Sequence, residues 1–150
     1  MAGKLWPERA NWYSEPDALD LAGIDPLLRE TVERINGSGW CWTAESCQGH
    51  PDDSSEYGPW ANNTKPMMRF VVWTRDLGRL MSALVRSMYY DREGGLLTQS
   101  CFFEVFPLPP ARHFQEYTEL LVYIQARTVW QRDEGCRAYG RLADLVLRDG

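Results

Sequence analysis

The sequence lacks long hydrophobic runs and is poor in cysteine and lysine. No apolar segment approaches the ~20 residues that a membrane-spanning helix needs, so we expect no membrane insertion. The N-terminus has no apolar core of the kind that marks a signal peptide. The few cysteines do not reach the density of a secreted disulfide scaffold; they are Cys41, Cys47, Cys101 and Cys136. The expected compartment is the cytoplasm, where the thiols stay reduced.

Excess positive charge is also missing. The chain has 16 Lys and Arg against 21 Asp and Glu, which gives a formal net charge of −5. Duplex DNA requires a concentrated basic surface, so the composition argues against a duplex-DNA partner, although it does not exclude a local basic patch. Aromatic residues are plentiful, with seven Trp, seven Tyr and five Phe. Such side chains favour either a large core or a surface that binds a protein partner.

Hydrophobic periodicity predicts an α+β fold with the element order α-β-β-α-β-β-α. Apolar residues recur at helical spacing in three segments, 26–36, 77–88 and 132–147. Four segments have the composition and flanks of strands, 40–43, 68–73, 97–106 and 119–129. The central strand–helix–strand unit should cross over right-handedly and make its two strands parallel. We therefore expect a single domain with a mixed four-stranded sheet and helices mainly on one face.

Two segments without periodicity accompany this domain. Residues 1–24 are predicted to form an irregular arm that packs on residues 25–150, and residues 50–66 are predicted to form a long loop. Loops of this length are often functional. Tyr57 and Trp60 lie in the loop and could either stack on the ring of a ligand or pack back on the core. At the end of the arm, Asp25 is expected to cap the first helix, with Pro26 at its first position.

The segment TAESCQGH, residues 43–50, concentrates reactive side chains and is predicted to be a loop after the first strand. Gly49 permits a positive φ, and successive backbone N–H groups in such a turn can bind an anion. We therefore expect a pocket for an anionic, nucleotide-like ligand or a modified base. The residues expected to bind this ligand are Thr43, Ser46, Gln48, Gly49, Tyr57, Trp60 and Arg69.

Three interpretations of Cys47 and His50 compete. A thiolate activated by the imidazole would be a nucleophile, which makes Cys47, His50 and Glu45 the candidate catalytic residues. Cys-x-x-His is also half of a zinc site, but the sequence shows no second paired half-site, and no metal ligands are assigned. The third interpretation is structural, with a small thiol under a turn and a surface histidine. The residues leave open which interpretation holds, and whether the protein is an enzyme.

Two groups of proteins resemble this region. Ile35-Asn36 followed by WTAESCQG at residues 42–49 resembles the signature of the wybutosine-synthesis transfer-RNA methyltransferases. In that family a helix ends in Ile-Asn, and a strand then leads to a Thr-Thr-Ser-Ser-Cys-Ser-Gly-Arg loop. Residues 31–73 resemble more closely a group of small uncharacterised bacterial and phage proteins. Those proteins have a Glu-Ser-Cys-Glu/Gln-Gly motif, a nearby His and a Pro-x-x-x-Phe strand, which Pro66 and Phe70 match.

The methyltransferase resemblance implies S-adenosylmethionine as cofactor and a modified guanine in transfer RNA as substrate. It implies a site lined by Ser46, Cys47 and Gly49. Glu45 stands where the family has Ser, and His50 stands where it has Arg, so a phosphate-binding cation would be present only when the imidazole is protonated. The alternative function is that of a non-catalytic bacterial or phage accessory protein, which sequesters a ligand or binds a protein partner through its aromatic surface.

Overall fold

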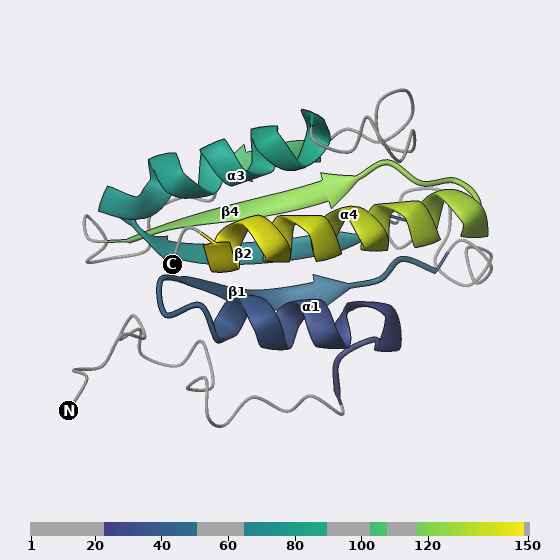
Figure 1. The fold of residues 1–150 in the computed structure, drawn as a ribbon. Coiled ribbons are helices and arrows are strands. Elements are labelled where there is room, and N and C mark those ends of the chain that lie inside the picture. Colours follow the sequence, from purple (N-terminus) through teal and green to yellow (C-terminus); the bar gives the residue numbers. More distant parts are fainter. Residues whose placement is uncertain (1–22, 51–64, 90–102, 108–116, 149–150) are drawn as a thin grey trace.

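The computed structural model of the protein describes residues 23–50, 65–89, 103–107 and 117–148 (Figure 1). Its elements follow in the order α1 (Pro26–Asn36), β1 (Cys41–Cys47), β2 (Met67–Trp73), the 3-10 helix η5 (Thr74–Asp76), α3 (Leu77–Tyr89), β3 (Phe103–Pro107), β4 (Tyr117–Ile124) and α4 (Val129–Arg148). The predicted α+β class and element order are confirmed. Most of the predicted arm and of the 50–66 loop, including Tyr57 and Trp60, lies outside the described residues.

Among the described residues, four strands form one sheet in the order β1-β2-β4-β3, and each neighbouring pair is antiparallel. The expected mixed sheet is therefore an antiparallel one. β2 and β3 do run in the same direction, because each pairs antiparallel with β4. β2 and β3, which are connected through α3, are not neighbours in the sheet. β4 lies between them and pairs with all seven residues of β2.

The three α-helices that the structure describes lie on the same face of the sheet, as predicted (Figure 1). The main core lies between this face and the helices, where alternate strand residues are buried. Tyr139 of α4 is fully buried there, and its hydroxyl donates to the Val122 carbonyl oxygen at 2.7 Å. None of the described helices combines the length and the apolar character needed to cross a bilayer.

The opposite face carries a second, smaller cluster. Trp42, Val71 and Tyr117 are buried there, and Trp73 packs against them. The rings of Trp42 and Trp73 meet edge to face with centroids 6.2 Å apart. Neighbouring residues of β2 point to alternate faces, so the odd-numbered residues of this strand share the face of Val71.

Of the two glycines in α4, Gly135 lies closer to the sheet than Gly140 does. A Cβ at Gly135 would lie 2.9 Å from Cγ of Pro66 and 3.1 Å from Cγ2 of Ile124, whereas a Cβ at Gly140 would have Oγ1 of Thr31 as its nearest neighbour, at 3.8 Å. Alanine improves helix propensity by about 1 kcal/mol at either position. Overpacking costs about 1–3 kcal/mol, and we expect it only at Gly135.

We therefore expect Gly140→Ala to be more stable than Gly135→Ala by about 1–3 kcal/mol. Denaturant unfolding of the two variants and the unmodified protein measures this difference. Equal stabilities of the two variants would show that α4 does not approach Pro66 and Ile124 this closely.

Candidate functional site

The segment expected to be a loop is mostly strand. Residues 43–47 belong to β1, and only residues 48–50 continue beyond it. Thr43 lies opposite Phe70, Glu45 opposite Arg69 and Cys47 opposite Met67. The prediction of a loop from residue 43 is therefore wrong, because β2 supplies hydrogen-bonding partners that outweigh the weak strand propensity of this polar stretch.

Glu45 follows a bulge in β1 and pairs with Arg69 instead of with the other candidate catalytic residues. The pairing register shifts between Thr43 and Glu45, and a bulge of this kind re-aims the side chains that follow it. Glu45 is 54% exposed, and its Oε2 lies 2.8 Å from Nη2 of Arg69, an odd-numbered β2 residue on the face without helices. The structure therefore does not bring Glu45 together with Cys47 and His50. Arg69, which is expected to bind the ligand, forms an ion pair with Glu45.

Thr43 is buried and holds α1 against β1. Nδ2 of Asn36, the last residue of α1, donates to Oγ1 of Thr43 and to the Val32 carbonyl oxygen, both at 2.7 Å. In return, the backbone N–H of Thr43 donates to Oδ1 of Asn36 at 3.0 Å. These bonds give Thr43 a structural role, and its expected contact with a ligand stays a prediction. Ser46, also expected to bind the ligand, is half-buried opposite Met68.

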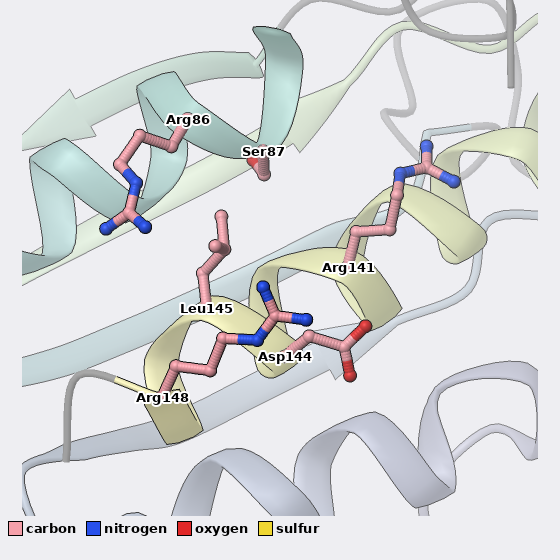
Figure 2. Close-up of a pocket in the computed structure, with 6 residues that line it drawn as sticks. All are labelled: Arg86, Ser87, Arg141, Asp144, Leu145 and Arg148. Atoms are coloured by element: carbon pink, nitrogen blue, oxygen red, sulfur yellow. The ribbon is translucent and has the colours of Figure 1, made fainter. Parts of the chain in front are cut away.

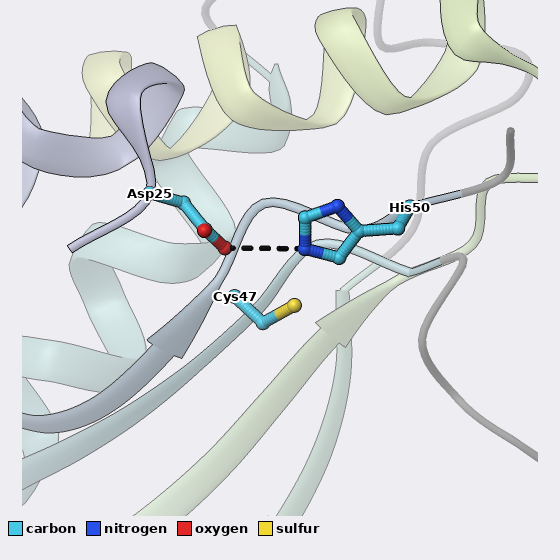
Figure 3. Close-up of side chains that lie close together, drawn as sticks. All are labelled: Asp25, Cys47 and His50. Atoms are coloured by element: carbon cyan, nitrogen blue, oxygen red, sulfur yellow. Dashed lines mark ion pairs between the residues drawn. The ribbon is translucent and has the colours of Figure 1, made fainter. Parts of the chain in front are cut away.

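Cys47 and His50 do come together, and Asp25 joins them (Figure 3). One ligand atom from each of the three side chains lies within 4.8 Å of the other two, and all three residues are half-buried. Nε2 of His50 is 3.5 Å from Oδ2 of Asp25. The cluster lies where the end of β1 meets the start of α1. We call these three residues the Asp25–Cys47–His50 site.

Asp25 is the residue of this candidate site that the sequence did not predict. It was expected to cap α1, but its side chain makes no cap hydrogen bond to the helix. Its Oδ2 instead accepts a hydrogen bond of 2.9 Å from the backbone N–H of Gln48. No motif links Asp25 to the later Cys-x-x-His, so only the fold reveals that the three residues meet.

The turn at residues 48–50 is fixed by contacts with α1 and α4. Gly49 has the positive φ that was predicted, at 85°. Its carbonyl oxygen accepts a 2.8 Å hydrogen bond from Nη1 of Arg132, which is buried in α4. Oε1 of Gln48 accepts from the Leu27 N–H at 3.2 Å, and the Gln48 carbonyl oxygen accepts from the Cys136 thiol at 3.5 Å. These bonds hold His50 in place beside Cys47.

The same turn offers little to an anion. The Gln48 N–H already donates to Asp25, and the Gly49 N–H donates to the sulfur of Cys47 at 3.4 Å. These are the backbone groups on which the expectation of an anion-binding turn rested. The carboxylate of Asp25 also faces the turn and would repel an anion. This carboxylate, rather than the turn, offers a partner to a cation.

The thiol of Cys47 is unlike that of an activated nucleophile. Burial raises its pKa above the ordinary value, the Gly49 N–H opposes this rise, and the nearby Asp25 carboxylate adds to it. A nucleophilic cysteine needs a lowered pKa, so the surroundings of Cys47 favour the neutral thiol. A divalent cation would reverse this balance, because a thiol that coordinates a metal loses its proton.

The three cysteines that the structure describes, Cys41, Cys47 and Cys136, are all free thiols.

Comparisons of the chain with protein-family models, with curated proteins and with solved structures find no match. The resemblances to the transfer-RNA methyltransferases and to the bacterial and phage proteins therefore stay predictions. The geometry of the Asp25–Cys47–His50 site is the basis for assigning a function.

Proposed function

We propose that the protein binds a zinc-class divalent metal ion through Asp25, Cys47 and His50. The observation that carries the proposal is the approach of one carboxylate oxygen, one sulfur and one imidazole nitrogen to within 4.8 Å of one another. Ligand atoms of a tetrahedral zinc ion are about 3–4 Å apart, given bond lengths of roughly 2.0–2.3 Å. Small rotations of the three half-buried side chains would bring their ligand atoms from within 4.8 Å to this closer spacing.

The ligand types favour zinc over calcium or magnesium. Calcium and magnesium prefer oxygen ligands, whereas a thiolate and an imidazole suit zinc and its neighbours among the transition metals. With Cys47 as thiolate, Asp25 as carboxylate and His50 neutral, the ligands would carry two negative charges. These charges would balance a divalent ion, and they would account for a carboxylate beside a half-buried thiol.

Three protein ligands leave one position of a tetrahedral ion for another molecule. Structural zinc sites are filled by four protein ligands, whereas sites with three keep a position for water or a substrate. An ion held in this way can bind an anionic or carbonyl oxygen of a small molecule and polarise it. We therefore propose metal-dependent binding of a small molecule as the function. The nucleotide-like ligand proposed from the sequence would meet the site through the metal rather than through the backbone of the turn.

The thiolate-nucleophile interpretation uses the same three residues and predicts the opposite behaviour. Asp25 beside His50, and His50 beside Cys47, have the order of a carboxylate, a base and a nucleophile. That mechanism needs a reactive thiolate at neutral pH without any metal. The raised pKa of Cys47 argues against it.

Thermal unfolding with and without Zn²⁺ tests the proposal. We expect the apo protein to bind one equivalent and to gain about 2.7 kcal/mol of stability at a free zinc concentration 100 times the dissociation constant. His50→Gln and Asp25→Asn should lose most of this gain, because each removes one ligand. Glu45→Gln is the matched control. It removes a carboxylate that lies in β1, as Cys47 does, but outside the site, so this variant should bind zinc as the unmodified protein does.

Two results would contradict the metal proposal. One is the absence of zinc-dependent stabilisation in the unmodified protein. The other is equal stabilisation of His50→Gln, Asp25→Asn and Glu45→Gln, which would place the bound metal elsewhere. Rapid modification of Cys47 by a thiol reagent at neutral pH, in the presence of a chelator, would favour the nucleophile instead.

A further inference from the structure

A cavity of about 480 Å³ lies between α3 and α4 (Figure 2). Its described lining includes Arg86, Arg141 and Arg148, whose guanidinium groups point to different sides instead of meeting around one ligand. Leu145, the apolar residue of the lining, is only 6% exposed. We therefore assign no ligand to this cavity. A better-defined binding surface lies at one edge of the sheet.

The sheet ends in β1 at one edge and in β3 at the other, and side chains cap the edge of β1. The backbone N–H of Cys41 donates to Oγ of Ser38 at 3.1 Å, and the N–H of Thr43 donates to Oδ1 of Asn36 at 3.0 Å. These two N–H groups point away from β2, because the direction of the backbone groups alternates along a strand. They are therefore not available to a strand from another chain.

The pairing register shows which backbone groups of β3 point outward. The Ile124 N–H donates to the carbonyl oxygen of Pro66 at 2.9 Å, on the side of β2. The backbone groups of Tyr123, the preceding residue of β4, therefore face β3, where Glu104 is the partner. Because the direction alternates, the N–H and C=O of Val105 point away from β4.

The outer edge of β3 is open among the described residues. By the same alternation, Phe103 and Val105 each direct an N–H and a C=O outward, whereas Pro107 offers only a carbonyl oxygen. Unlike the N–H groups of β1, these groups have no side-chain cap in the described part of the chain. All five residues of β3 are half-buried or exposed. An uncapped edge of this kind can pair with another strand.

Phe106 adds apolar surface beside this edge. Val105 packs against the main core, so its neighbour Phe106 lies on the face without helices. There the ring of Phe106 meets that of Tyr123 edge to face, with centroids 6.0 Å apart. Phe106 is nevertheless 47% exposed. A strand added to β3 would cover this ring.

The charge on β3 does not oppose the approach of an identical strand. Edge strands are often protected by unpaired charges, but the single charged residue of β3 is Glu104. Its Oε1 lies 3.5 Å from Nζ of Lys65 and accepts a hydrogen bond from Gln125. Because this ion pair is neutral, two copies of the edge would not repel each other.

We propose that two copies of the chain pair through β3, antiparallel and about a two-fold axis at Val105. Val105 and the partner's Val105 would then exchange two backbone hydrogen bonds. Each Phe103 N–H would donate to the partner's Pro107 carbonyl oxygen, so the missing N–H of proline costs only the outermost bonds. Phe106 and the partner's Phe106 would be diagonal neighbours, a separation that aromatic rings can bridge.

A second copy is preferred to a different protein because this strand is complementary to itself. A two-fold contact also closes the assembly, since the capped β1 edges leave no open edge for further growth. The pairing would join the two four-stranded sheets into one. The inference does not depend on the metal site, which lies at the end of β1.

Sedimentation velocity over a wide concentration range, with a chelator present, tests the pairing independently of any metal. Val105→Pro removes the outward N–H and keeps the bonds to β4. Phe106→Lys replaces the exposed ring by a charge and keeps its backbone bonds. Val85→Lys is the matched control, because Val85 is 43% exposed on α3 and lies away from β3. Thermal unfolding confirms that each variant is folded.

We expect the mass of the unmodified protein to rise with concentration from 17.3 kDa to twice this value. Phe106→Lys and Val105→Pro should weaken the dimer by about tenfold or more, since they remove apolar contact or hydrogen bonds. Val85→Lys should dimerise as the unmodified protein does. A protein that is monomeric at every concentration, a dimer that both β3 variants leave unchanged, or assemblies that grow beyond a dimer would overturn the proposal.

Amide hydrogen exchange of the unmodified protein gives a second test, which does not depend on the folding of any variant. The N–H groups of Phe103 and Val105 should exchange more slowly at high protein concentration than at low concentration. The N–H groups of Cys41 and Thr43, which are capped within the chain, should exchange at the same rate in both. Exchange at Val105 that does not change with concentration would contradict pairing through β3.

Discussion

Cys47→Ser is expected to bind zinc more than about a hundredfold more weakly than the unmodified protein. Loss of a residue that only supports a ligand costs roughly 10- to 100-fold in metal affinity, and Cys47 is proposed as a ligand itself. Serine has nearly the same size and leaves the end of β1 intact, but its hydroxyl does not become an anionic ligand near neutral pH. Competition against a chelating dye of known affinity measures the change.

The pH dependence provides the control for this prediction. Because burial and Asp25 raise the pKa of Cys47, the thiol is protonated in the metal-free protein near neutral pH, and zinc must displace this proton. The affinity should therefore rise with pH, by about tenfold per pH unit for each proton released. Cys47→Ser should have a shallower dependence. Equal slopes for the two proteins would mean that the sulfur does not bind the metal.

Asn36→Ala is expected to lower the free energy of unfolding by about 3 kcal/mol, because the change would leave the buried N–H and Oγ1 of Thr43 without their partner, at about 1–3 kcal/mol for each such group. Urea or thermal unfolding measures the loss. Thr43→Val is the matched comparison: it removes only the hydroxyl and keeps the backbone bond to Asn36, so it should cost less. An Asn36→Ala variant as stable as the unmodified protein would contradict the structural role given to this pair.

Much of the fold could be predicted because local signals agree with it. The predicted range of α1 matches, since Pro26 marks its start and Leu28, Val32 and Ile35 form one buried stripe. The long amphipathic patterns of α3 and α4 were recognised for the same reason. Local signals contain no information about which strands become neighbours, and the insertion of β4 between β2 and β3 could not be predicted from them.

The end of β1 shows how tertiary pairing overrides composition. Residues 43–47 are polar, and the sequence predicted a loop for them, yet β2 pairs with them as far as Cys47. The bulge that follows Thr43 then places Glu45 opposite Arg69, with which it forms an ion pair. Period-2 reasoning cannot locate such a shift, because one inserted residue exchanges the two faces.

Two of the three residues of the candidate site could be predicted from the sequence. Cys47 and His50 could be recognised because their spacing is that of half a metal site, and the structure brings them together. Asp25 precedes a helix, where an aspartate normally indicates a cap, and this local interpretation concealed its contact with the turn.

The absorption spectrum of the protein loaded with one equivalent of Co²⁺ tests the metal site most directly, because it reports the ligand atoms themselves. Coordination by the Cys47 thiolate in a four-coordinate site predicts a sulfur-to-cobalt charge-transfer band in the near ultraviolet and intense visible bands, both lost in Cys47→Ser and kept in Glu45→Gln. A weak, octahedral-type spectrum without a charge-transfer band, or a band that persists in Cys47→Ser, would contradict a metal site built from Asp25, Cys47 and His50.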